Sequence, residues 1–400
     1  MQTRCRSKLL TVLTLAAGLA AIVATAAASN TSAQARLAAL PAEPTAPADN
    51  PTTPERVALG RLLFWDPILS GQKDVACATC HHPAFGYSDG LDLSIGANGA
   101  GLGPSRAFAA GHDSRLVKRN SQTILNVAFN GLTGGGDLVP ADAPMFWDVR
   151  VRGLEAQALE PLKALEEMRG GAQPEDRAVS AAVSRLNAIA EYRRLFALAF
   201  GGGTPVNDRN LGRALAAFQR TLVAVNAPFD RYMRGDTTAL SPEQLRGMER
   251  FQSVGCVNCH SGPMFSDFAT HVLAVPDSPK LPETDSGVNH TYAFRTPSLR
   301  NLSATAPYMH NGVFATLAEV VNFYQRINRG GGRRGGGGGR GVNTRVDRSQ
   351  IDPLVRQLNM RGRGQQDIIA FLRALDDPNF DRTIPKRVPS GLAVGGHLEQ

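Results

Sequence analysis

The stretch VACATCHHPAFGYSDG, residues 75–90, decides which fold this chain can adopt, and CVNCH at 256–260 repeats its central pattern. Each contains two cysteines separated by two residues and followed directly by a histidine: Cys77, Cys80 and His81 in the first, Cys256, Cys259 and His260 in the second. CxxCH is the attachment motif of a c-type haem, in which two sulfurs bond to the haem and the adjacent histidine ligates its iron. The sequence therefore predicts two covalently bound haem c groups, with His81 and His260 as iron ligands.

Other uses of CxxC fit less well. A zinc ribbon places its two CxxC pairs about 15 to 20 residues apart, whereas these pairs lie roughly 180 residues apart. A thioredoxin-like CxxC requires a βαβ context, which the sequence does not indicate. A disulfide within each pair leaves both histidines unexplained.

The first 35 residues have the pattern of a signal peptide. Three positive charges within 4–8 precede an apolar run at 9–28, and AQA at 33–35 fits a cleavage site, with 26–28 as the second choice. The alternative is an uncleaved membrane anchor, since the run is long enough to span. Haem c is attached outside the cytoplasm, so we expect export to the periplasm and no stable membrane insertion after cleavage.

The charge of the chain does not indicate nucleic-acid binding. Net charge is +8 over 400 residues, and three of these charges lie in the predicted signal peptide. Much of the rest lies in RGGGRRGGGGGRG at 329–341, which cannot pack a core and is predicted to be a flexible loop. We expect no nucleic-acid partner.

Hydrophobic periodicity predicts a mainly α protein with few strands. Ser241, Pro242 and Gln244 form a helix-start signature that leads directly into the second CxxCH. The expected fold is two haem-binding helical domains, 36–206 and 207–400. The other expected helices cover 154–168, 178–200, 207–226, 316–326 and 365–375, and Pro161 must kink the first of these or begin a second helix within it.

Several ordered motifs besides CxxCH are similar to those of the bacterial di-haem cytochrome c peroxidase family, which includes MauG-type enzymes. The resemblance runs from about Thr53 to Leu375. It rests on CATCHHPAFGYSDG, LSIG (93–96), KRNSQTILNVAFNG (118–131), FWDVR (146–150), LEAQA (154–158), EEM (166–168), FDRYMRGD (229–236), CVNCH, FRTPSLRN (294–301) and PYMHNG (307–312).

The resemblance implies two cytochrome c-like domains, the first (36–206) reacting with peroxide and the second (207–400) transferring electrons. Classical members carry a histidine after the LSIG-like segment that caps the resting first haem. Here that position is Ala97, which implies an open first haem, and His112 is the alternative cap.

Three residues match the family's reaction machinery around the first haem. Glu167 matches the group that takes a proton from one peroxide oxygen and returns it to the other. Gln157 matches a residue that orients peroxide by hydrogen bonding, and Trp147 matches the aromatic relay between the haems. The alternatives are a solvated charge for Glu167 and core packing for Trp147. Val149 departs from the usual glycine of FWDGR.

Two further ligand sets follow from the resemblance. Asn120, Thr305 and Pro307 match an inter-domain calcium site, for which oxygen donors are suited. Tyr324 matches the place where peroxidase members carry the second haem's distal methionine. An anionic phenolate lowers the haem potential and is the MauG-type feature. Met309 and Met360 are alternative ligands, and a plain helix-face aromatic is a third option.

The sequence thus predicts a periplasmic di-haem oxidoreductase that uses hydrogen peroxide, with a MauG-like His/Tyr second haem. One alternative is a peroxidase that draws electrons from a small cytochrome or cupredoxin, and another is a non-enzymatic electron carrier. The expected partners are peroxide and a redox protein or protein substrate. Family members are monomers or homodimers.

Overall fold

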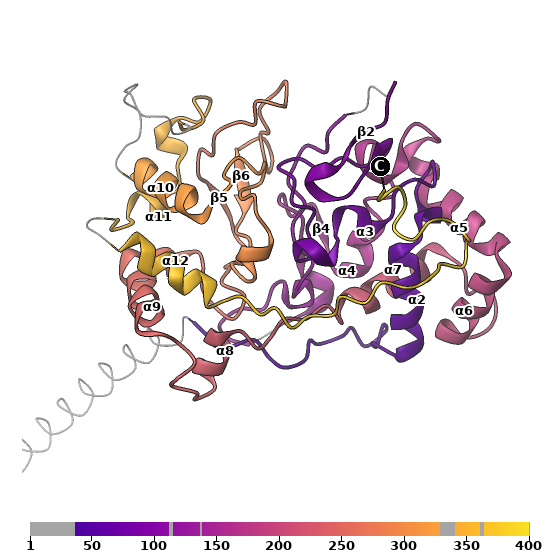
Figure 1. Ribbon diagram of the computed structural model, residues 1–400, viewed down its shortest axis with the longest axis horizontal. Helices are drawn as coiled ribbons and strands as arrows, with labels where there is room; N and C mark the ends of the chain where they lie inside the picture. The colour runs from indigo at the N-terminus through magenta and orange to yellow at the C-terminus, as the bar shows by residue number, and fades with distance from the viewer. Residues whose placement is uncertain (1–36, 112–114, 137, 329–340, 361–363, 400) are drawn as a thin grey trace, which may run out of the picture.

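The computed structural model describes residues 37–111, 115–136, 138–328, 341–360 and 364–399 (Figure 1). The predicted signal peptide, His112 and nearly all of the Arg/Gly tract lie outside the described residues. Within the described residues, no helix is long and apolar enough to cross a membrane.

The described chain is mainly helical, as predicted, with three two-stranded antiparallel ladders: β1–β2, β3–β4 and β5–β6. The strands are β1 (Gly99–Ala100), β2 (Ala107–Phe108), β3 (Pro144–Met145), β4 (Val151–Arg152), β5 (Thr270–Val272) and β6 (Ala293–Arg295). The helices are α2 (Pro54–Trp65), α3 (Cys77–Cys80), α4 (Leu154–Gln157), α5 (Ala178–Ala188), α6 (Ala190–Phe200), α7 (Asp208–Gln219), α8 (Pro228–Met233), α9 (Pro242–Val254), α10 (Leu317–Asn328), α11 (Pro353–Arg356) and α12 (Gln365–Arg373).

The helices gather into two halves, α2–α7 and α8–α12, which lie side by side in Figure 1. In each half, the helix that precedes CxxCH crosses a later helix at a glycine. A Cβ on Gly60 of α2 would lie 2.0 Å from Ala214 O of α7, and one on Gly247 of α9 would lie 1.9 Å from Asp367 O of α12. Both distances are below van der Waals contact, so each helix pair approaches as closely as its backbones allow.

The signature at Ser241 forms the predicted helix start. The Ser241 hydroxyl accepts from the Gln244 N–H, the Gln244 side chain accepts from the Ser241 N–H, and α9 begins at Pro242. Gly255, in the left-handed conformation with φ of 100°, ends α9 one residue before Cys256. The second CxxCH is therefore fixed to the end of a well-capped helix.

The helix expected over 178–200 is divided into α5 and α6 at Ile189, whose backbone is extended (φ −94°, ψ 116°). No Gly or Pro marks this break, so it arises from tertiary packing. The turn brings Tyr192 into the core of the first half, where its hydroxyl donates to the buried Asp66 carboxylate at 2.6 Å.

The ends of the chain cross between the halves. Helix α7 follows the expected junction at 206/207, yet it packs into the core of the first half. The segment 376–399 also returns to the first half, where Gly396 pairs with Val75 just before the first CxxCH. At the other end, Leu37 pairs with Gly262 and packs into the core of the second half.

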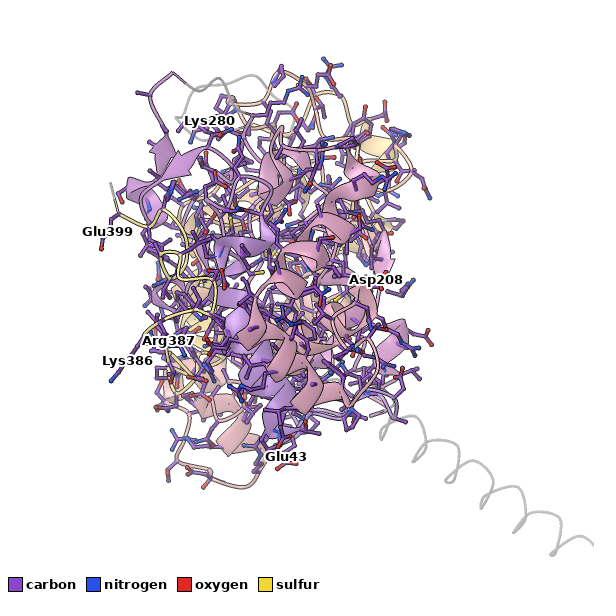
Figure 2. The ribbon with its side chains drawn as sticks, turned by 90° about the vertical axis from the view of Figure 1, so that its right-hand side faces the viewer. Glu43, Asp208, Lys280, Lys386, Arg387 and Glu399 are labelled. Carbon is purple, nitrogen blue, oxygen red and sulfur yellow. The ribbon has the colours of Figure 1, made fainter. Side chains whose placement is uncertain are left out.

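Figure 2 views the first half and labels Lys386 and Arg387 on this C-terminal segment. Arg387 makes two 2.9 Å hydrogen bonds to the Glu191 carboxylate of α6. Nearer the first CxxCH, Thr79 donates to Gly395 O at 2.9 Å. The C-terminal segment therefore supports the haem motif of the other half.

Candidate functional site

One cavity of about 610 Å³ runs between the two halves and reaches both CxxCH motifs. Burial raises the pKa of Cys77 and of Cys256 to about 12, so both thiols are protonated at neutral pH. All four motif cysteines are free of disulfides. The cavity wall includes all six motif residues: Cys77, Cys80, His81, Cys256, Cys259 and His260.

The two motif histidines are held in the same way. His81 Nδ1 lies 3.0 Å from Tyr87 O, and His260 Nδ1 lies 2.9 Å from Phe265 O. Tyr87 and Phe265 both have left-handed backbones, with φ of 58° and 52°. A carbonyl can only accept, so each Nδ1 carries the proton and each Nε2 keeps its lone pair.

Burial lowers the pKa of both His81 and His260, which keeps the imidazoles neutral. A neutral imidazole with its second nitrogen fixed by a carbonyl is the arrangement of a histidine metal ligand. Together with the free thiols and the position of both motifs on one cavity, this fits two haem c groups.

The predicted peroxide-handling residues face the cavity beside the first motif. Gln157 ends α4, and Glu167 lies on a π-helical turn, Leu165–Arg169. Burial raises the pKa of Glu167 to about 7, and repulsion from Glu166 and Glu160 adds to this while Arg150 opposes it. A carboxyl group with this pKa can accept and return a proton near neutral pH.

Ala97 is buried, and its main-chain N–H donates to Glu167 O at 2.8 Å. The segment that carries the cap in classical family members therefore contacts the turn that holds Glu167. The alternative cap, His112, lies outside the described residues.

Trp147 lines the cavity that both motifs share and is 8% exposed. Its Nε1–H donates to Asn120 O at 3.0 Å, and its carbonyl accepts from the Arg295 N–H of the second half at 2.7 Å. Val149, two residues on, has φ of 50°, a conformation that a β-branched residue rarely adopts and that glycine adopts freely. The structure thus places the predicted relay at the boundary of the two halves.

Sequence reasoning missed two rings near Trp147, those of His310 and Phe294. His310 lies edge-on to Trp147 at 6.5 Å and stacks on Phe294 at 3.7 Å, with an interplanar angle of 12°. Burial lowers the pKa of His310 to about 3, so this ring is neutral. Arg119 lies over Phe294 at 5.5 Å and pairs with Asp285 of the second half at 2.6 Å. The PYMHNG motif, which contains His310, was the only sequence feature that could have indicated this residue.

Tyr324 of α10 faces the cavity on the side of the second motif. Burial raises the pKa of its phenol above the usual range, as do the nearby sulfurs of Cys259 and Cys256. Met309 and Met360 also line the cavity, so all three candidate ligands face the same cavity.

Each of the three predicted calcium ligands, Asn120, Thr305 and Pro307, also lines the cavity. Asn120 Nδ2 donates to Leu91 O at 2.8 Å, which leaves Oδ1 as the acceptor end of the amide. One amide oxygen and two main-chain carbonyls are ligands that fit Ca²⁺.

A second residue that sequence reasoning missed is His271, which lines the cavity near the second motif. Its Nδ1 lies 2.7 Å from Asp352 and its Nε2 lies 2.9 Å from Asp267. Hydrogen bonding to Asp267 and to Cys259, with a further bond to Asp352, raises its pKa to about 11. Cys259, Asp267 and His271 lie close enough to hold a metal ion, but attachment of a haem to Cys259 occupies that sulfur.

Comparisons with known proteins relate this chain to di-haem proteins, as the two CxxCH motifs on the cavity predict. The sequence profile described as di-haem cytochrome c peroxidase matches residues 54–238. Cytochrome-c peroxidase IdrP1 of Pseudomonas sp. (strain SCT) is 36% identical over 405 residues, covering 90% of this chain and 93% of that protein. Methylamine utilization protein MauG of Methylorubrum extorquens is 34% identical over 345 residues, covering 85% and 83%.

Among solved structures, a MauG-like protein associated with microbial copper homeostasis matches with a TM-score of 0.67 and 28% identity, covering 84% of this chain and 95% of that one. The similar proteins therefore carry both peroxidase and MauG names.

Proposed function

Because the chain belongs to the di-haem cytochrome c peroxidase family, we propose that it is a periplasmic oxidoreductase that uses hydrogen peroxide and carries a His/Tyr pair at its second haem. The observation that carries the His/Tyr assignment is the burial of Tyr324 in the wall shared with Cys256, Cys259 and His260.

In this proposal, Cys77 and Cys80 attach the first haem and His81 ligates it, while Cys256, Cys259 and His260 do the same for the second. When bound, the haems would supply the two electrons that, together with two protons, reduce hydrogen peroxide to two molecules of water. Asn120, Thr305 and Pro307 hold a calcium ion between the halves.

The first half supplies proton transfer. Glu167, with a pKa of about 7, accepts the proton of one peroxide oxygen and returns it to the oxygen that leaves. Gln157 donates a hydrogen bond from the end of α4 and orients peroxide. Both groups line the cavity and are half-buried, so fewer waters compete for these contacts than at the surface.

Trp147 passes electrons between the haems. Its indole is fixed by the bond to Asn120 O and by the edge-on His310, so ring motion is restricted. A phenolate from Tyr324 lowers the potential of the second haem, which suits sharing of oxidising equivalents with a protein substrate over a long distance.

The experiment is stopped-flow absorbance and EPR on the oxidised holoprotein with one equivalent of peroxide. We expect reaction without prior reduction, a spectral change at both haems, and loss of the second-haem change in Tyr324→Met. Tyr232→Met is the matched control, because Tyr232 is half-buried against the same core but is not part of the cavity wall.

The second candidate is a peroxidase supplied with electrons by a small cytochrome or cupredoxin. The presence of Met309 and Met360 in the cavity wall favours it, since a thioether ligand gives a high potential. In that case peroxide reacts only after one haem is reduced, and Met309→Leu or Met360→Leu changes the second-haem spectrum while Tyr324→Met does not. A protein that is entirely low-spin and inert to peroxide would instead be an electron carrier.

A further inference from the structure

We propose that two glycines, Gly96 and Gly71, position Glu167 by clamping the main chain of its π-helical turn from both sides. Gly71 lies on the loop before the first CxxCH segment, and Gly96 lies on the loop after it. The inference rests on the proposed acid–base role of Glu167. The glycines are positioning residues that act through this turn without contacting peroxide.

Gly96 contacts the turn from the loop after the first motif. A Cβ at this position would lie 2.3 Å from Glu166 O, 2.4 Å from Glu167 O and 2.8 Å from Glu167 Cα. The next residue, Ala97, donates its N–H to Glu167 O at 2.8 Å. Only glycine at position 96 allows the two main chains to lie this close. The close approach lets the Ala97 N–H donate directly to the carbonyl oxygen of Glu167.

Gly71 contacts the same turn from the loop before the motif. Its N–H donates to Met168 O at 2.8 Å, and a Cβ on it would lie 2.0 Å from Arg169 O. Successive carbonyls of the turn, those of Glu167 and Met168, are therefore bonded by main-chain donors from two loops. Both loops lead to the first CxxCH, so the clamp fixes Glu167 relative to the attached haem.

The turn needs such support because it is only a single π-helical turn, Leu165–Arg169. π-helical geometry is rare and occurs mostly as single turns at functional sites. Here it is closed by hydrogen bonds from Arg169 N–H to Ala164 O at 3.0 Å and from Gly170 N–H to Leu165 O at 3.1 Å. A single turn of this kind does not fix the direction of a side chain by itself.

Arg106 holds the Gly96 loop rigid. Its buried guanidinium donates to Ile95 O at 2.5 Å and to Gly96 O at 2.9 Å, and it also bonds Gly101 O and His397 O at 3.0 Å. His397 belongs to the C-terminal segment that crosses from the other half. The loop therefore cannot yield easily when a larger residue is placed at position 96.

The size of the expected effect follows from these distances. A methyl group at position 96 must gain about 1 Å to reach ordinary contact with Glu167 O, and a misplacement of about 1 Å can slow catalysis by ~10²-fold. Gly171→Ala is the matched control, because this exposed glycine follows the turn directly and a Cβ there would have no atom within 4 Å.

The test measures the rate constant of the holoprotein with peroxide in Gly96→Ala, Gly71→Ala, Gly171→Ala, Glu167→Gln and the double variant Gly96→Ala/Glu167→Gln. We expect a loss of ~10²-fold in both clamp variants, no change in Gly171→Ala, and no further loss in the double variant beyond Glu167→Gln. A second readout is hydrogen exchange, in which the Ala97 amide should exchange faster in Gly96→Ala.

Multiplicative losses in the double variant would overturn the inference, because the glycine would then act by another route. Unchanged rates in Gly96→Ala and Gly71→Ala, with Glu167→Gln slow, would overturn the clamp and leave the proposed function standing. A normal rate in Glu167→Gln would refute the acid–base role as well. If neither glycine variant retains haem, rapid exchange of the Ala97 and Gly71 amides in the unmodified holoprotein would still refute the clamp.

Discussion

The pH dependence of the peroxide reaction should report the ionisation of Glu167. Burial raises the pKa of this carboxyl group from 4.5 to about 7, and only the ionised form can accept a proton. With that pKa, about 1% of Glu167 is ionised at pH 5 and about half at pH 7, so the rate constant should rise about 50-fold over this range and at most about twofold above it.

Glu167→Gln should abolish this rise. General acid–base catalysis contributes at least ~10²-fold, so the variant should be slower than the unmodified protein by about that factor at pH 8. The difference should nearly vanish at pH 5, because only about 1% of Glu167 is ionised there and the variant rate does not change with pH.

The assay is stopped-flow absorbance with excess peroxide in buffers from pH 5 to 9. Glu160→Gln is the control: Glu160 is not in the cavity wall, and its negative charge raises the pKa of Glu167. This variant should keep the plateau and move the midpoint to lower pH. A midpoint near pH 7 that survives in Glu167→Gln would show that another group titrates, and the assignment would be refuted.

The boundary between the halves gives three more predictions. Trp147→Phe should keep the peroxide reaction and slow electron exchange between the haems, measured by double-mixing absorbance, while stability falls by about 1 kcal/mol through loss of the bond to Asn120 O. A calcium chelator should lower the melting temperature of the holoprotein, and Asn120→Ala should remove that sensitivity in differential scanning calorimetry. Asp285→Asn should cost about 2 kcal/mol at pH 7, because the Arg119 pair lowers the pKa of Asp285 from 3.8 to about 2. That stabilisation is present above pH 4 and lost as pH falls through 2, so denaturant curves of variant and parent should converge there.

The parts of the fold that sequence could predict are those coded by local chemistry. The capping box at Ser241 specifies where α9 begins, and the spacing of CxxCH specifies which side chains face a haem. Both signals need only neighbouring residues, so they survive without knowledge of tertiary contacts.

The parts that failed depend on distant contacts. The helix expected over 154–168 ends at Gln157, and the Glu167 turn is π-helical. Pro161 lacks an N–H and interrupts the helix, but nothing in the local sequence indicates a turn clamped by glycines some 70 and 95 residues earlier. The return of the C-terminal segment 376–399 to the first half could not be predicted either, because an irregular segment has no hydrophobic periodicity that would indicate where it packs.

The same limitation explains why His310 was missed, whereas Trp147 was predicted as a relay. Both residues stand in motifs that resemble those of the family, but the resemblance implies a role only for Trp147. The ring contacts of His310 depend on packing between distant segments. Asn120 joins the two, since its N–H donates to His310 O at 2.8 Å while its own carbonyl accepts from Trp147 Nε1. An ion held by the Asn120 side chain would therefore restrain the main chain that fixes both rings. Replacement of Asn120 should therefore impair both ion binding and electron transfer between the haems, because this one residue supports both.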